Sequence, residues 1–199
     1  MGDEFLTRNT LLQRAKDPKD ERAWAEFVSY YETFIFILLR QMNVPQQDCD
    51  DLTQAVLIKV WNKLATFDQE RAKFRTWLST LIRNTVINHW DVQTRRWRRE
   101  EKFGEAQVEP PTGLPSSPEF DVIYQKEWEA YITNLAIKNV RGEFKENAMQ
   151  VFEMALNNIS TAEIAEQLDL HTATVTRLKN RVRDRLIQEV RNLRHELEL

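Results

Sequence analysis

Apolar side chains recur through most of the chain three and four residues apart, which is the spacing of one face of an α-helix. Leu52, Val56 and Val60, for example, keep this spacing in a stretch that is otherwise polar. The pattern predicts helices over residues 20–42, 48–64, 74–99, 123–142, 145–157, 161–168 and 172–195, with at most one short helix before Asp20. Because no segment shows the strict alternation of a half-buried strand, we expect an all-α fold.

Four of the six prolines fall in one stretch, GEAQVEPPTGLPSSPEF. Proline lacks the backbone donor that a helix interior needs, so we expect this stretch to be an extended, Pro-rich acidic linker. It divides the chain into an N-terminal helical domain (residues 1–102), the linker (103–118) and a C-terminal helical domain (119–199).

The segment STAEIAEQLDLHTATVTRLKNRVRDRL has the features of a helix-turn-helix. Ser160 and Glu163 have the spacing of a capping box, which starts a helix. Asp169 stands at the tight turn, where Asp tolerates a left-handed backbone, and Thr172 is placed to cap the second helix. Ala165 stands where two crossing helices need a small side chain, and the predicted buried seam consists of Ile164, Leu168, Leu170, Val175 and Leu178.

The second helix of this motif has an apolar side and a basic side. The apolar side carries Val175, Leu178, Val182 and Leu186, and the other carries Thr174, Arg177, Lys179, Asn180, Arg181, Arg183 and Arg185. Residues 171–194 include seven basic and two acidic side chains, a net charge of +5. Such side chains read base edges or hold phosphates in the major groove, so we favour duplex DNA binding over an ordinary solvated helix.

The stretch FRTWLSTLIRNTVINHWDVQTRRWRR mixes aromatic with basic side chains. Residues 71–99 include eight basic and one acidic side chain, a net charge of +7. Single-stranded DNA is bound in this way, with bases on aromatic rings and phosphates on Arg. Arg95, Arg96, Arg98 and Arg99 are predicted phosphate contacts, whereas Trp77 lies in the apolar stripe and is predicted to be core.

These two motifs, in this order, resemble a bacterial RNA polymerase sigma factor, in particular the extracytoplasmic-function (ECF) group of the sigma-70 family. DDLTQAVLIKVWNKL is similar to the family's polymerase-binding helix, and FRTWLSTLIRNTVINHW to its promoter-melting segment. The resemblance implies an alternative sigma factor that binds core RNA polymerase and directs promoter recognition and melting. It places on or beneath the polymerase-docking surface Asp50, Asp51, Leu52, Gln54, Val56, Leu57, Trp61 and Leu64.

The resemblance also implies contacts with promoter DNA. The loop Phe67–Lys73 would hold a base flipped out of the melted upstream element, and helix residues after it would contact the non-template strand. The residues implied at the melted element are Phe67, Lys73, Arg83, Asn84, Asn88, Arg95, Arg96, Arg98 and Arg99. Those implied at the upstream duplex are Thr172, Thr174, Arg177, Lys179, Asn180 and Arg181. The linker would thread the polymerase cleft, either as an acidic mimic of nucleic acid or as a solvated tether.

Composition excludes several other classes of protein. The 199 residues contain one cysteine, Cys49, so a disulfide framework and a thiolate zinc site are excluded. The three histidines lack metal-ligand spacing and there is no glycine-rich phosphate loop, so we expect no enzyme, no catalytic residue, no metal and no cofactor. No apolar run reaches the roughly 20 residues that a bilayer requires, so we expect a cytoplasmic protein without membrane insertion.

The net charge of −3 argues, by itself, against a nucleic-acid partner. It is, however, a sum over opposed blocks, because the two basic windows alternate with residues 103–129 and 143–169, each of net charge −5. The expected partners are core RNA polymerase, promoter DNA in single-stranded and duplex form, and the anti-sigma factor that the family commonly uses. A helix-turn-helix regulator that acts on duplex DNA without polymerase remains the alternative, but it explains only residues 160–186.

Overall fold

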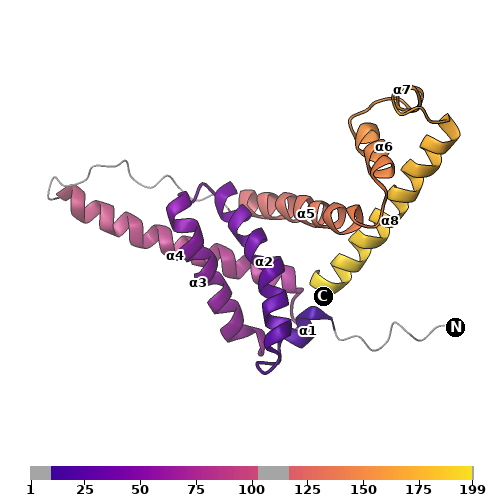
Figure 1. The fold of residues 1–199 in the computed structure, drawn as a ribbon. Coiled ribbons are helices and arrows are strands. Elements are labelled where there is room, and N and C mark those ends of the chain that lie inside the picture. The colour runs from indigo at the N-terminus through magenta and orange to yellow at the C-terminus, as the bar shows by residue number, and fades with distance from the viewer. Residues whose placement is uncertain (1–9, 103–116, 199) are drawn as a thin grey trace. The chain divides into compact units, whose positions relative to one another are not determined.

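The structure, a computed structural model, describes residues 10–102 and 117–198, and every regular element in them is a helix (Figure 1). The helices are α1 (Leu11–Ala15), α2 (Glu21–Gln41), α3 (Gln46–Leu64), α4 (Phe74–Lys102), α5 (Ser117–Arg141), α6 (Glu146–Leu156), α7 (Thr161–Gln167) and α8 (Thr172–Glu198). The all-α prediction is therefore confirmed. Most of the predicted linker, residues 103–116, lies outside the described residues.

The chain divides into two compact units. The first comprises Met1–Glu129 with Glu196–Leu199, and the second comprises Ala130–His195. The two units divide after Glu129, whereas the proline-rich stretch predicts that the C-terminal domain begins at residue 119. α5 begins at Ser117, with Pro118 in its first turn, where the missing backbone donor has no intrahelical partner to lose.

Aromatic rings form the centre of the first unit. Phe27 and Tyr31 of α2 stack with centroids 4.3 Å apart, and the ring of Phe74, at the start of α4, meets both rings edge-on. α3 packs against α2 and α4 and buries Cys49, whose thiol pKa is raised by burial. The first unit thus presents α3 and α4 on a core built largely by α2.

The beginning of α5 belongs to the first unit because its aromatic side chains pack into that unit's core. Trp128 is fully buried, edge-on to Phe34 at 4.8 Å and stacked on Tyr31 at 5.9 Å. The Arg75 guanidinium of α4 lies over the rings of Trp128 and Tyr124, at 5.1 and 5.8 Å. These contacts account for the position of the boundary between the units.

The last residues of the chain are also fixed in the first unit. The Tyr31 hydroxyl donates a hydrogen bond to the carbonyl oxygen of Leu197 at 2.5 Å, in a buried position. The backbone N–H of Leu11 donates to a carboxylate oxygen of Glu196 at 3.1 Å. These two hydrogen bonds place residues 196 and 197 with α1 and α2.

The second unit has two small hydrophobic clusters. One joins Val151 of α6, Ile164 and Ala165 of α7, and Val175 of α8. The other joins Ala148, Met149 and Val182, with partly buried residues packed around it, among them Ile137, Phe144, Phe152, Leu178 and Leu186. The predicted inward face of the last helix is confirmed, and α6 and α7 hold that helix from two sides.

Candidate nucleic-acid and protein interfaces

α3 separates the eight residues predicted for polymerase docking into two groups. Leu52, Val56, Leu57 and Leu64 are buried and hold the helix on its neighbours. Asp50, Asp51, Gln54 and Trp61 are exposed, and with Ile58 they form one stripe along the helix, called here the α3 stripe. Ile58, which is 59% exposed, was not predicted. The sequence could have indicated its exposure, because Ile58 lies off the apolar face of α3. It is four residues after Gln54 and three before Trp61, so all three lie on the same side of the helix.

The α3 stripe is supported from beneath by α2. Trp61, 39% exposed, meets the ring of Trp24 edge-on at 4.7 Å, and Gln54 donates a hydrogen bond to the Glu32 carboxylate at 3.3 Å. A surface depression beside the stripe is lined by Glu32, Thr33, Phe36, Asp50, Thr53 and Gln54. The stripe therefore combines acidic groups with two exposed apolar side chains, Ile58 and Trp61, which suits a protein partner with basic residues.

Phe67 is buried rather than available for base stacking. Its ring is 7% exposed and packs against Phe74 at 5.6 Å and Trp77 at 5.1 Å. Lys16 donates to the Phe67 carbonyl at 2.8 Å and lies over its ring. The expectation that Phe67 itself meets the flipped base is therefore revised, because the faces of this ring are occupied. Trp77 packs in the same cluster, as predicted.

The loop after Phe67 presents polar side chains. Asp68, Glu70, Arg71 and Lys73 are exposed, and Arg71 pairs with Asp68 at 3.3 Å. A base held here would meet hydrogen-bonding groups at the rim of an aromatic cluster. Lys73 remains a candidate for contact with DNA phosphate.

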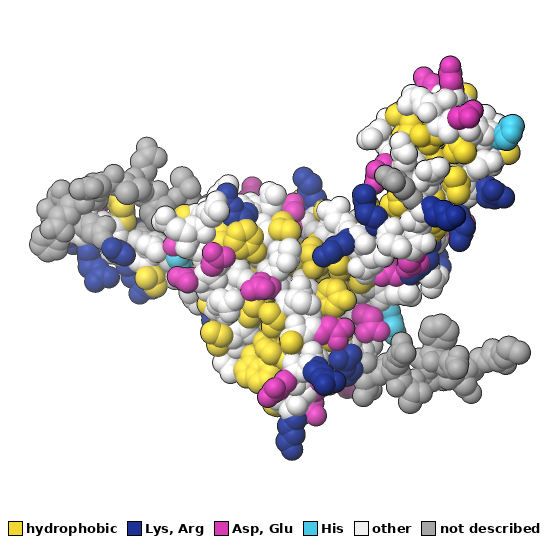
Figure 2. Space-filling view, in the orientation of Figure 1, with side chains coloured by type: hydrophobic (Ala, Val, Ile, Leu, Met, Phe, Trp, Pro, Cys, Tyr) yellow, Lys and Arg dark blue, Asp and Glu magenta, His cyan; other side chains and the backbone are white. Residues whose placement is uncertain are grey.

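α4 carries the predicted single-strand residues along its length. Asn84 and Asn88 are exposed one turn apart, and Arg83 is half-buried. Arg95 and Arg99 each donate to a backbone carbonyl four residues earlier, which lays their aliphatic stems along the helix. Arg95, Arg96, Arg98 and Arg99 are all exposed, and Figure 2 shows Lys and Arg side chains gathered at this end of α4. The structure thus presents amides along the middle of the helix and cations at its end.

The capping box of the helix-turn-helix is present as predicted. The Ser160 hydroxyl accepts from the Glu163 backbone N–H at 3.2 Å, and the Glu163 carboxylate accepts from the Ser160 backbone N–H at 3.0 Å. These hydrogen bonds with Ser160 lower the pKa of Glu163. Asp169 has a φ of 50°, the left-handed backbone expected at the turn.

Thr172 is the first residue of α8, not its cap. The carbonyl of His171 accepts the first hydrogen bonds of the helix, from the N–H groups of Thr174 at 2.8 Å and Val175 at 3.0 Å. The predicted cap was therefore placed one residue too late. Thr172 stays at the start of the predicted recognition helix, where its side chain is exposed.

The basic side chains of α8 fall into two classes. Arg185 donates two hydrogen bonds to Glu143, at 2.7 and 2.6 Å, and one to Glu189 at 3.0 Å. These bonds, chiefly those with Glu143, raise the pKa of Arg185. Arg177 and Arg181 are exposed, whereas Thr174, Lys179 and Asn180 are half-buried. Arg185 is thus held in a structural ion pair, while the exposed predicted DNA contacts Arg177 and Arg181 lie nearer the start of the helix.

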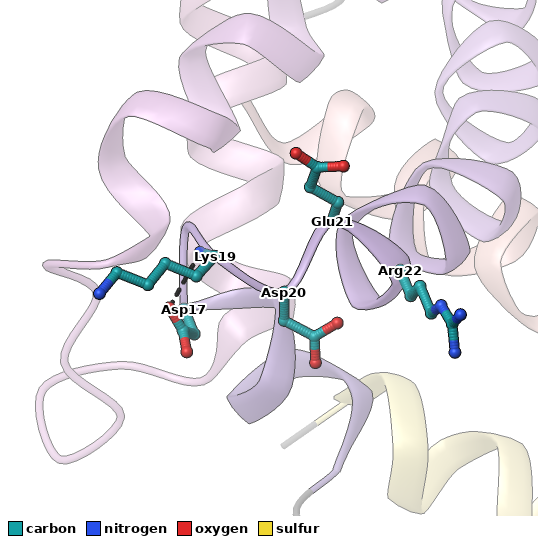
Figure 3. A pocket seen from close by; sticks show the side chains of 5 residues that line it. All are labelled: Asp17, Lys19, Asp20, Glu21 and Arg22. Atoms are coloured by element: carbon teal, nitrogen blue, oxygen red, sulfur yellow. Dashed lines mark hydrogen bonds between the residues drawn. The ribbon is translucent and has the colours of Figure 1, made fainter.

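A hollow at the turn between α1 and α2 has a structural explanation. It is lined by Asp17, Lys19, Asp20, Glu21 and Arg22 (Figure 3). Asp17 accepts from the backbone N–H of Lys19 at 2.9 Å, and Asp20 accepts from that of Ala23 at 2.8 Å, which caps α2. Two of the carboxylates in this hollow therefore stabilise the turn.

Residues 10–102 and 117–198 contain neither a metal-binding cluster nor a membrane-spanning helix. No three His, Cys, Asp or Glu side chains are grouped there so that they could hold a metal ion. In the same residues, no helix is long and apolar enough to cross a membrane.

Comparisons with known proteins agree with the geometry of the first unit. The model of sigma-70 region 2 matches residues 27–96, from within α2 to the basic end of α4. The chain is 25% identical to the ECF RNA polymerase sigma factor RpoE of Cereibacter sphaeroides over 184 residues, which cover 90% of this chain and 93% of that protein. It is 23% identical over 106 residues to the ECF RNA polymerase sigma factor SigK of Mycobacterium tuberculosis, covering 53% of this chain and 56% of that protein.

A search of solved structures finds CnrH in complex with the cytosolic domain of CnrY, with 21% sequence identity and a TM-score of 0.36 over 89% of this chain and 93% of that one. The assignment rests instead on the sequence comparisons. Residues 27–96 therefore match sigma-70 region 2, and over nearly its whole length the chain is similar to an ECF sigma factor.

Proposed function

We propose that this protein is an alternative sigma factor, which binds core RNA polymerase and directs promoter recognition and melting. The observation that carries the proposal is the α3 stripe. Asp50, Asp51, Gln54, Ile58 and Trp61 form an exposed acidic and apolar face inside the segment that matches sigma-70 region 2. Exposed large apolar side chains beside charged ones, as Ile58 and Trp61 are here, are typical of a surface that a protein partner covers.

In the proposed mechanism, the first unit docks on polymerase through the α3 stripe and presents α4 to melted DNA. The amides of Asn84 and Asn88 hydrogen-bond bases of the non-template strand, which expose their edges once they are unpaired. The arginines at the end of α4 contact phosphates. The exposed polar groups of the loop Phe67–Lys73 hold the flipped base, at a cost of a few kcal/mol of lost stacking.

The second unit anchors the upstream promoter element as duplex. α7 and the turn at Asp169 fix the start of α8, whose exposed Thr172, Arg177 and Arg181 are available to the major groove and its phosphates. Residues 103–116 connect the two DNA-binding elements along the chain. This division of labour assigns melting to one unit and duplex recognition to the other.

The role is one of binding and positioning, not of catalysis by the chain itself, and it is carried out in the cytoplasm, where polymerase and DNA are present. An anti-sigma factor that covers these surfaces is a further expected partner. The helix-turn-helix regulator is not favoured, since it leaves the α3 stripe and the basic end of α4 without a function.

The proposal is tested by assembling the purified chain with core polymerase and separating the mixture by size. A one-to-one complex that a second sigma factor displaces is the expected result. A chain that protects duplex DNA alone, but neither binds core polymerase nor competes with a sigma factor, would support the regulator instead. The variant Val122→Ala is a suitable control, because this exposed apolar residue lies on α5, outside the α3 stripe.

A further inference from the structure

The loop between α5 and α6, residues 142–145, contacts two arginines of α8 by different means. Glu143 accepts two hydrogen bonds from Arg185, at 2.7 and 2.6 Å. The next residue, Phe144, presents its ring to Arg181, whose guanidinium carbon lies 5.5 Å from the ring centroid. Two neighbouring loop residues thus hold two arginines that are one helical turn apart.

These two contacts leave the arginines with different charge. Arg185 faces the carboxylates of Glu143 and Glu189, so its positive charge is compensated within the protein. The contact between Arg181 and Phe144 is with an uncharged ring, so it leaves the positive charge available. Arg181 is also exposed, as a group that meets DNA must be.

The ring contact and a phosphate contact are compatible. A guanidinium over an aromatic ring uses its face, while its N–H donors lie in its own plane and point outward. A long side chain that is already ordered loses less rotamer freedom when it binds. The Phe144 ring can therefore favour phosphate binding without competing for the donors that phosphate needs.

We infer that Phe144 is a positioning residue, which holds the Arg181 guanidinium ready for a backbone phosphate of duplex DNA, while Glu143 keeps Arg185 as a structural ion pair. The inference rests on the proposed duplex-binding role of α8. It names the residue that prepares one of the DNA contacts.

Phe144 also packs in a hydrophobic cluster, and that contribution must be separated from its effect on Arg181. Phe144 and Phe152 are both partly buried against the cluster of Ala148, Met149 and Val182. The variant Phe144→Leu removes the ring from Arg181 and keeps an apolar side chain in the cluster. Phe152→Leu makes the same chemical change in the same cluster and is the matched control.

The experiment measures binding of the full-length chain to a short duplex of mixed sequence, by fluorescence anisotropy across a series of salt concentrations. Phe144→Leu should weaken binding about two- to fivefold, because the Arg181 side chain then loses more rotamer freedom when it binds. Phe144→Tyr, which keeps a ring, and Phe152→Leu should bind like wild type. Arg181→Ala should weaken binding and reduce the slope of log K against log salt by about one. In the Arg181→Ala background, Phe144→Leu should have no further effect.

Three results would overturn the inference: equal losses for Phe144→Leu and Phe152→Leu, an undiminished effect of Phe144→Leu without Arg181, or tighter binding by Phe144→Leu. A wild-type chain that shows no duplex binding at low salt would also overturn it, since phosphate contacts do not depend on sequence. The assay contains no polymerase. If the coupling of Phe144 to Arg181 is observed but the chain fails to bind core polymerase, the positioning role of Phe144 is supported and the proposed sigma-factor function is excluded.

Discussion

The indole of Trp61 on α3 lies edge-on against the indole of Trp24 on α2, with the ring centroids 4.7 Å apart. Trp24 in turn stacks on the buried ring of Phe27 at 5.2 Å. Trp61 is therefore held by the core on one side while its other side faces solvent. A large aromatic side chain that is ordered before binding is the kind of residue that contributes most to a protein interface.

Replacing this anchor should weaken binding to core polymerase. Trp61→Ala is expected to lower the affinity about tenfold or more, because the interface loses a preformed aromatic contact. Since Trp61 is substantially exposed in the free chain, the loss of folding stability should be smaller than for a buried Trp. Titration of labelled core polymerase measures the first effect and thermal unfolding the second. Val122→Ala, which removes an apolar side chain 69% exposed on α5, should leave the affinity unchanged, and equal losses for the two variants would exclude the α3 stripe as the docking surface.

Replacing Asn84 should impair promoter melting without affecting polymerase binding. Asn84→Ala should reduce formation of the open promoter complex about fivefold, the effect of losing one hydrogen bond, while affinity for core polymerase stays unchanged. Permanganate reactivity of unpaired thymines measures the first quantity, and titration of core polymerase measures the second. Asn134→Ala, on the exposed side of α5, is the control. If Asn84→Ala lowered the affinity for core polymerase to the same extent, Asn84 would be assigned to the polymerase interface and not to the DNA-binding surface.

Replacing different arginines of α8 should have different effects on the salt dependence of duplex binding. Arg177→Ala is expected to reduce the slope of log K for duplex binding against log salt by about one, because it removes a phosphate contact. Arg185→Ala should leave that slope unchanged and instead lower stability, because it breaks the ion pairs with Glu143 and Glu189. Their partly exposed positions limit the stability loss to about 1 kcal/mol. A reduced slope for Arg185→Ala would mean that this residue leaves Glu143 to bind DNA.

The capping box should make the start of α7 sensitive to acid. Hydrogen bonds with Ser160 lower the pKa of Glu163 in the folded chain below its ordinary value of 4.5. The carboxylate therefore stabilises the folded state above that value, and this stabilisation is lost as the pH falls through the lower folded pKa. Glu163→Gln keeps an acceptor but does not titrate. After correction for the intrinsic pH dependence of amide exchange, the protection of the α7 amides should fall more steeply on acidification in the wild type than in Glu163→Gln, and identical protection profiles would argue against the capping box.

The hydrogen bond from Tyr31 to Leu197 should stabilise the first unit. Tyr31→Phe removes the donor and leaves the buried Leu197 carbonyl without it, at a cost of about 1–3 kcal/mol in the free energy of unfolding. Thermal unfolding measures the change. A Tyr31→Phe variant as stable as the wild type would show that the hydrogen bond to Leu197 adds nothing to stability.

The sequence predicts the helices well because each has an apolar face that must be buried, and the spacing of that face is visible without coordinates. The capping box and the turn at Asp169 are local features, set by residues a few positions apart, and the structure confirms both. The cap of α8 differs by one residue, since Thr172 and His171 are both able to occupy that place and the choice depends on backbone geometry.

Long-range packing is what the sequence does not predict. Trp128 marks a helix, but nothing near it in the sequence indicates that it stacks on Tyr31, about a hundred residues earlier, or that the first compact unit extends to Glu129. Phe67 lies in a polar loop and is predicted to meet DNA, yet Phe74 and Trp77 bury it. The pairing of Arg185 on α8 with Glu143 in the loop between α5 and α6 joins residues far apart in the sequence, so a count of basic residues along α8 overstates what is available to DNA.

The most direct test of the central claim is transcription by core polymerase with and without this chain, on fragments that cover the organism's own promoters, followed by mapping of the 5′ ends. The account predicts transcripts that start at defined sites only when the chain is present, and that Trp61→Ala and Asn84→Ala reduce while Val122→Ala does not. Core polymerase that gives the same transcripts with and without the chain, at concentrations where the chain binds duplex DNA, would contradict it.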